Sequence, residues 1–161
     1  MEKALGEAEK STCATHNVPE RINAAKAIAA SIFMCKSAGT KKEIKTFVGQ
    51  AFDYDFSLTV EDWQNRKIST NTEISPVQPA FAAFMEASDY EEAIRLAIAI
   101  GGPSNTIASI AGALAEAYFK HIPKSITRRA LSRITPEMQS ILNAFEEKYM
   151  TVAKPTAQKT I

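Results

Sequence analysis

Apolar residues recur at helical spacing along nearly the whole chain, and no segment shows the apolar–polar alternation that is typical of a half-buried strand. The most apolar stretch is residues 24–34, where Ala, Ile, Phe and Met occupy almost every side of a helix. A helix that is apolar all round is buried in a core. The sequence therefore predicts an all-α fold, a compact bundle of about eight helices with a central helix at residues 21–36.

Short connections with proline, glycine or capping residues separate the predicted helices. Thr40 and Glu43 have the spacing of a capping box. Ser88 is expected to cap a later helix, and Ser104 or Asn105 the long helix that Pro123 ends. We expect helices over residues 2–12, 21–36, 41–52, 59–65, 76–87, 88–100, 106–121, 125–134 and 136–150, the fourth of them short and centred on Trp63, with polar loop at 69–73.

A chain of 161 residues, 45% of them apolar, suits one domain with its own core. We predict a single helical domain over residues 1–150 and a polar, frayed tail over 151–161. A net charge of +1 gives no sign of nucleic-acid binding. Cys13 and Cys35 lie in helical segments without a partner motif and are predicted to be free thiols.

No apolar run approaches the roughly 18 residues that a bilayer span requires. The first ten residues are charged and lack the apolar core of a signal peptide. With the free thiols, these features predict a cytoplasmic protein that binds no membrane.

The segment Gly101-Gly102-Pro103-Ser104-Asn105-Thr106 connects two Ala-rich helical segments. A tight Gly-Gly turn before a helix is where a fold can place acidic ligands for a hard cation, and Mg²⁺ and Ca²⁺ prefer carboxylate oxygens. The two candidate ligand positions here hold Pro103 and Asn105, and neither carries a charge. The segment therefore resembles a metal-binding loop that has lost its ligands.

The residues around this loop resemble the C-terminal part of the ADP-ribosylglycohydrolase family. Residues 87–102 read ASDYEEAIRLAIAIGG, and Ser104, Thr106 and the small residues of the next helix continue the likeness. Thr15-His16-Asn17, Pro19-Glu20 and the Ala-rich helix after them resemble the middle segment of the family, with Asp53–Asp55 and Pro76–Phe84 in the right order between. The resemblance covers residues 7–149.

The resemblance implies an all-α fold like the C-terminal half of that family's fold. It also implies hydrolysis of ADP-ribosyl glycosidic bonds with two Mg²⁺ or Mn²⁺ ions. The family's loop reads G-G-D-S-D-T, and its metal ligands fall on Pro103, Asn105 and Thr106, of which only Thr106 keeps a ligand type. The family's Thr-Asp-Asp-Thr metal motif and Gly-Ser-Ala-Met-Arg phosphate loop are absent from this sequence. We therefore expect a truncated, degenerate member with no catalytic residues, no bound metal and a lost ancestral Mg²⁺ site.

A second set of residues could still contact a nucleotide, because a histidine at the place of His16 lies near bound ADP-ribose in the family. His16 has a structural alternative, because it can instead cap or pack against a helix. Outside this set, Asp53 and Asp55 form either a metal pair or a solvated helix end. His121 is expected near a helix C-terminus, where cations are favoured. The candidate nucleotide-binding residues are His16, Asn17, Gly101, Gly102 and Ser104.

Several functions remain open. The leading hypothesis is an inactive protein-interaction or inhibitor module, a homodimer or the partner of another protein, of the kind that suits phage or mobile-element counter-defence. Its contact surface is expected on the helices over 21–36 and 107–118. The alternatives are a module that binds ADP-ribose or a related nucleotide, and a residual hydrolase completed by another chain.

Overall fold

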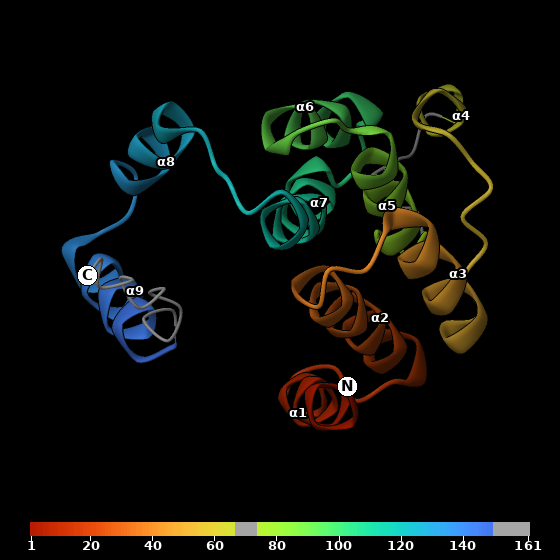
Figure 1. Ribbon diagram of the computed structural model, residues 1–161, viewed down its shortest axis with the longest axis horizontal. Coiled ribbons are helices and arrows are strands. Elements are labelled where there is room, and N and C mark those ends of the chain that lie inside the picture. Colours follow the sequence, from red (N-terminus) through yellow and green to blue (C-terminus); the bar gives the residue numbers. More distant parts are fainter. Residues whose placement is uncertain (67–73, 150–161) are drawn as a thin grey trace, which may run out of the picture. The chain divides into compact units, whose positions relative to one another are not determined.

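The computed structural model describes residues 1–66 and 74–149, and every regular element within these ranges is an α-helix (Figure 1). The predicted all-α class is therefore confirmed, with nine helices in the described residues. They are α1 (Glu2–Cys13), α2 (Pro19–Lys36), α3 (Lys41–Phe52), α4 (Val60–Asn65), α5 (Val77–Glu86), α6 (Tyr90–Ile100), α7 (Ser104–Phe119), α8 (Lys124–Leu131) and α9 (Pro136–Tyr149).

The chain divides into two compact units, Met1–Ile122 with α1 to α7 and Pro123–Ile161 with α8 and α9. The single domain expected over residues 1–150 stays a prediction, and the expected tail and the polar loop at 69–73 lie outside the described residues. Cys13 and Cys35 are free, and Cys35 is buried. Within the described ranges, no helix is both long and apolar enough to cross a membrane.

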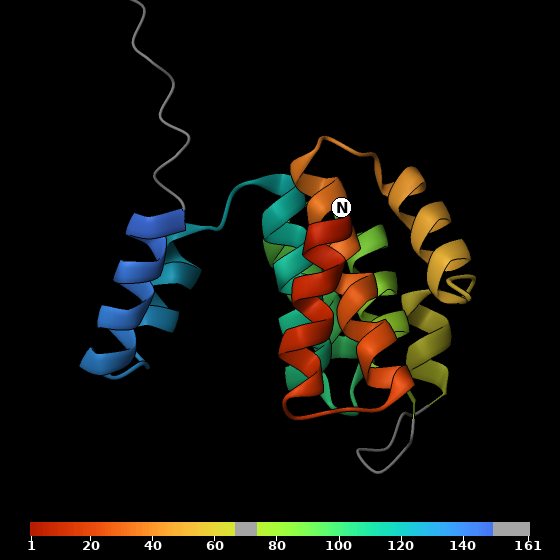
Figure 2. The same ribbon diagram turned by 90° about the horizontal axis from the view of Figure 1, so that it is seen from below.

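Helix α7 is the centre of the first unit and packs against α2, α5 and α6 (Figures 1 and 2). Its apolar residues Ile107, Ala111 and Leu114 are fully buried, and the core around them includes Phe81 and Phe84 of α5. The expectation that residues 107–118 offer an interaction face is therefore wrong, because α2, α5 and α6 cover the apolar side of α7.

Helix α2 occupies the inner position that its composition predicts. Ala27, Ala30 and Cys35 are buried, and α1, α3 and α7 pack around the helix. Helix α1 has no buried residue and contacts α2 along its length; an ion pair between Glu9 and Lys26 joins the two. Most of the apolar surface of α2, which the sequence suggested as a contact surface for a partner, is thus covered by other helices of the first unit.

The irregular stretch after α3 is held by specific contacts. Asp53 ends α3 in the left-handed conformation with φ 56°. Phe56 stacks on Phe81 with ring centroids 4.4 Å apart, and Thr59 and Asp62 form the capping box of α4. Glu86 accepts a hydrogen bond from the Val60 backbone N–H at 2.8 Å, which fixes α4 to the end of α5.

Lys41 joins three helices. Its ammonium donates hydrogen bonds to the carbonyl oxygens of Met85 and Ala87 at the end of α5, at 3.2 and 2.5 Å. It also lies over the rings of Phe84, Tyr118 and Phe119, 5.0 to 5.6 Å from their centroids. Burial lowers the pKa of Lys41, and the carbonyls and rings offset part of the cost of burying the charge.

Three helix boundaries differ from their predictions. The N-cap of α6 is Asp89, whose carboxylate accepts from the Glu92 backbone N–H, and not Ser88. Helix α7 begins at Ser104 with Pro103 in the cap position, so neither Ser104 nor Asn105 caps it. It ends at Phe119, where Lys120 takes the left-handed conformation, before Pro123 is reached.

Candidate functional site

The α6–α7 connection is a tight turn built on two glycines with positive φ. Gly101 has φ 82° and ψ −157°, and Gly102 has φ 62°. The turn is closed locally, because the Ser104 N–H donates to the Gly102 carbonyl at 2.8 Å and the Thr106 N–H to the Pro103 carbonyl at 2.9 Å. The first turn of α7 therefore has few N–H groups left for an anion.

The positions that the resemblance assigns to metal ligands lie in this turn and the start of α7. Asn105 and Thr106 are exposed, and Pro103 is half-buried. Together they present one amide and one hydroxyl as oxygen ligands and no carboxylate. Among residues 1–66 and 74–149, no three His, Cys, Asp or Glu side chains come together in a group that could hold a metal ion.

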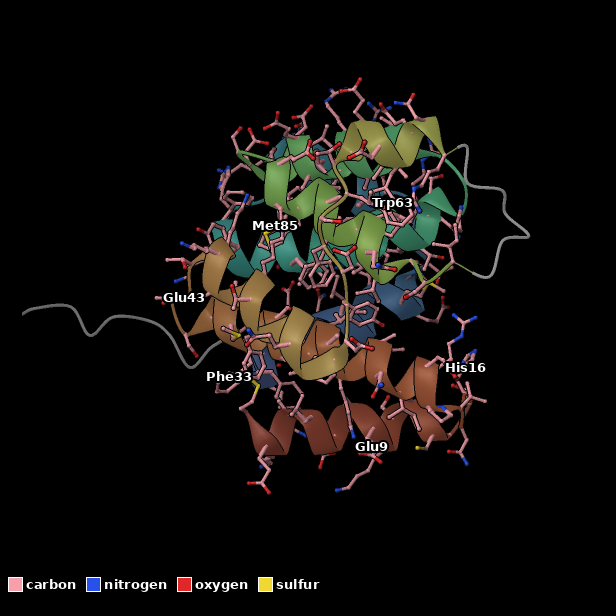
Figure 3. All side chains as sticks on the ribbon, turned by 90° about the vertical axis from the view of Figure 1, so that its right-hand side faces the viewer. Glu9, His16, Phe33, Glu43, Trp63 and Met85 are labelled. Atoms are coloured by element: carbon pink, nitrogen blue, oxygen red, sulfur yellow. The ribbon has the colours of Figure 1, made fainter. Side chains whose placement is uncertain are left out.

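His16 and Asn17 lie in the connection between α1 and α2, and both are exposed (Figure 3). A hydrogen bond of 2.9 Å joins His16 Nδ1 to the Thr15 hydroxyl, and the His16 backbone N–H donates to Thr12 at 2.8 Å. Val18, and not His16 or Asn17, occupies the cap position of α2, and Pro19 is its first residue. The His16 side chain therefore does not cap this helix.

The α1–α2 and α6–α7 connections lie at the same end of the first unit, because α2 and α7 run in the same direction (Figure 2). The fold thus brings the two halves of the predicted nucleotide site to one end of the bundle. No hydrogen bond or ion pair within the described residues joins His16 or Asn17 to the 101–106 segment.

A polar cleft of about 610 Å³ lies beside the first turns of α2. The charged groups in its lining are Glu20, Arg21 and Asp53, and Tyr54 and Asn23 add a phenol and an amide. The sequence did not predict this cleft. The only available signals were the Pro19-Glu20 match and the Asp53–Asp55 pair, because the lining comes from α2, the end of α3 and the residues just before α5.

The remaining sequence candidates do not gather at this end as ligands. Asp55 accepts hydrogen bonds from the Ser57 N–H and hydroxyl, at 2.8 and 2.9 Å, and these bonds lower the pKa of the Asp55 carboxyl. Asp53 is the C-cap residue of α3 and borders the cleft. His121 is exposed after the end of α7. The solvated-terminus interpretation of Asp53 agrees with its position.

Comparison with known proteins gives one result on the family. The sequence model of the ADP-ribosylglycohydrolase family matches residues 1–155. Curated proteins and solved structures give no significant match. The match spans nearly the whole chain and includes the Gly-Gly turn, the His16 connection and all nine described helices. The chain belongs to the ADP-ribosylglycohydrolase family.

Proposed function

We propose that this protein is an ADP-ribosylglycohydrolase-like protein that does not carry out metal-dependent hydrolysis and acts by binding another macromolecule. The proposed loss of metal-dependent hydrolysis rests on the α6–α7 turn. Pro103 and Asn105 stand where carboxylates would be needed, and Thr106 supplies the remaining side-chain oxygen. A two-metal site uses several carboxylates to balance four positive charges.

Calorimetric titration with Mg²⁺ and Mn²⁺ tests the loss of the metal site directly. The wild type is expected to bind neither ion more tightly than millimolar. The matched variant Pro103→Asp/Asn105→Asp, which puts two carboxylates back on the same turn, is expected to bind Mn²⁺ more tightly than the wild type. Tight binding by the wild type, or metal-dependent release of ADP-ribose from an ADP-ribosylated peptide, contradicts the proposal.

Exposed apolar side chains support the interaction role. In the first unit they include Val18, Phe33, Phe47 and Ile98. Phe47 and Met34 line a shallow groove of about 700 Å³ between the end of α2 and α3, and Glu43, labelled in Figure 3, also lines it. Apolar groups that gather on a surface mark contacts with partners. We infer a homodimer or an inhibitor of another protein, the latter a form suited to phage or mobile-element counter-defence.

Light scattering combined with co-purification from the native host tests this role. We expect either a mass above that of one chain or a protein that is recovered stoichiometrically. Phe33→Asp/Phe47→Asp puts charges on two of these exposed apolar side chains and is expected to abolish the recovery of a partner that docks on them. A monomer that recovers no partner contradicts the interaction role without affecting the metal titration.

The polar cleft beside α2 favours a second candidate, the binding of ADP-ribose or a related nucleotide without cleavage. Arg21 places a guanidinium in the cleft, and this group pairs well with phosphate oxygens. A thermal-shift titration with ADP-ribose is expected to raise the Tm of the wild type and not of Arg21→Ala. Lys36→Ala removes a cation from the other end of α2 and serves as the control. An equal response of all three proteins contradicts the binding of nucleotide in this cleft.

A further inference from the structure

Helix α9 has an apolar stripe along one side. Met138, Ile141, Phe145 and Tyr149 are spaced three or four residues apart, which places them on one face of a helix. Ile141 is 71% exposed and Phe145 55% exposed. The rings of Phe145 and Tyr149 lie 4.8 Å apart between centroids, as expected for neighbours on the same face. The half-buried Leu142 borders this stripe.

The second unit has no core of its own in the described residues. Neither α8 nor α9 contains a buried residue, although α8 carries Ile126 and Leu131 and the turn after it carries Ile134. Two amphipathic helices have too little apolar surface to cover each other's stripes, whereas four do so in a bundle. Within itself, this unit leaves the α9 stripe uncovered.

The charges of the two helices are opposite. Helix α8 and its following turn carry Lys124, Arg128, Arg129 and Arg133 and no acidic residue. Helix α9 carries Glu137, Glu146 and Glu147 against the single basic residue Lys148. In the described part of the chain, the four basic side chains of the α8 region form no ion pair and are exposed. The unit therefore consists of a basic helix that is followed in the sequence by an acidic helix.

We propose that the α8–α9 hairpin is the dimerisation surface of this protein and that its occupant is the same hairpin of a second copy. In a two-fold contact, a residue of α8 that meets α9 of the partner is matched by the reverse contact. A hairpin with one basic and one acidic helix is complementary to itself in this arrangement. The resulting four helices bury both α9 stripes and set α8 of each copy beside α9 of the other.

The charge pattern argues against a membrane as the occupant of the stripe. Helices that lie on anionic membranes carry Lys and Arg on the polar side. The polar side of α9 is mainly acidic, so it would be repelled by anionic lipid headgroups. The inference deepens the interaction role proposed above and names its partner and surface.

A first experiment removes the apolar stripe. The wild type is expected to show twice the 17.6 kDa chain mass in light scattering, in a concentration-dependent manner. Ile141→Glu/Phe145→Glu is expected to weaken dimerisation at least tenfold. Ser140→Glu/Asn143→Glu adds the same two charges to exposed positions on the opposite side of the same helix, and is expected to leave the dimer intact. Fluorescence of Trp63, the single tryptophan, checks that the first unit remains folded.

A second experiment tests the charge pairing between copies. Arg128→Glu/Arg129→Glu/Arg133→Glu gives the α8 region a net negative charge like that of α9, and Glu146→Lys/Glu147→Lys makes both helices basic, so each variant alone is expected to be monomeric. Mixed in equal amounts, they present opposite charges at both α8–α9 contacts and are expected to form a heterodimer. Pairing of α8 with α9 within one chain would give no gain on mixing.

A wild type that is monomeric at all concentrations overturns the inference, as does a dimer that keeps its affinity in Ile141→Glu/Phe145→Glu. Dimerisation does not depend on metal or nucleotide, so these outcomes are read separately from the calorimetric and thermal-shift tests. A monomer that nevertheless recovers another protein through Phe33 and Phe47 would refute the homodimer and retain the interaction role.

Discussion

At the scale of single residues, backbone conformation and desolvation determine which positions tolerate change. Gly101 combines positive φ with ψ −157°, a region that is essentially restricted to glycine. Cys35 is 1% exposed, and burial raises the pKa of its thiol to about 11. Each of these residues supports a prediction about stability.

Gly101→Ala is expected to destabilise the protein by about 1–3 kcal/mol because alanine strains the backbone there. A Cβ at Gly101 would meet no atom within 4 Å, so the cost comes from conformation and not from a clash. Gly6→Ala in helix α1, where a Cβ also meets nothing within 4 Å, is expected to stabilise by about 0.5–1 kcal/mol. Urea unfolding of both variants measures the two effects, and equal signs would contradict the assignment of strain to Gly101.

Stability is expected to fall between pH 9 and about 11 because of Cys35. The folded state keeps this thiol protonated where the unfolded chain, with a pKa near 9.0, has already lost the proton. The contribution is therefore complete below pH 9 and is lost as the pH rises toward 11, by roughly 2–3 kcal/mol.

Urea unfolding under reducing conditions across this window measures the loss, and Cys35→Ala is the control that should lack it. Lys41 has the opposite effect on stability, because its pKa is lowered in the folded state and its contribution to stability therefore grows as the pH rises toward 10.5. A Cys35→Ala variant with the same decline as the wild type would contradict the prediction.

At the scale of helices, the end of each element depends on one or two side chains. Thr40 with Glu43 and Thr59 with Asp62 form complete capping boxes. At the start of α6, the two kinds of hydrogen bond in a capping box are made by two different residues. Asp89 caps the helix, and the Ser88 N–H and hydroxyl both donate to the Glu92 carboxylate, at 2.6 and 2.5 Å. These bonds lower the pKa of the Glu92 carboxyl.

Asp89→Ala is expected to cost about 1 kcal/mol of stability, the typical value of a lost N-cap. Ser88→Ala is expected to cost less, because the backbone N–H of residue 88 keeps its bond to Glu92. Thermal unfolding of the two variants compares them directly. A larger loss of stability in Ser88→Ala than in Asp89→Ala would support Ser88 as the N-cap, as the sequence alone predicts.

The capping boxes show what sequence can predict for helix ends. Thr40 and Glu43 are identified from spacing alone, because both partners lie within one turn. Ser88 and Asp89 are both good capping residues, and only backbone geometry decides between them. At Pro103, the tight Gly-Gly turn brings the chain into the cap position one residue before the predicted Ser104, so local sequence preference is overridden.

At the scale of the whole chain, burial is uneven. The first unit holds every fully buried residue of the described ranges, among them Phe81, Phe84, Ile107 and Leu114. The second unit has none. Because resistance to local opening follows buried apolar contacts, the two units should differ in amide protection.

Hydrogen exchange is expected to be slow in α5 and α7 and fast in α8 and α9 at low protein concentration. Protection of α9 is expected to rise with concentration as the dimer forms, while that of α5 and α7 stays constant and serves as the internal control. Slow exchange in α9 that does not depend on concentration would contradict this prediction.

The sequence by itself determined the helical class, most helix boundaries, the inner position of α2 and the uncharged side chains at positions 103, 105 and 106. These features are local: periodicity, capping spacing and side-chain chemistry are fixed by neighbours along the chain. The family match agrees with the resemblance carried by residues 87–118.

Only the tertiary structure decided which apolar faces are covered. Residues 107–118 looked like an open surface in sequence, and packing against α2, α5 and α6 buries them. The polar cleft likewise depends on residues from three elements that are distant in sequence. Periodicity shows that a helix has an apolar side, but the partner of that side is set by how the chain folds back. Within the second unit, α8 leaves the apolar stripe of α9 exposed.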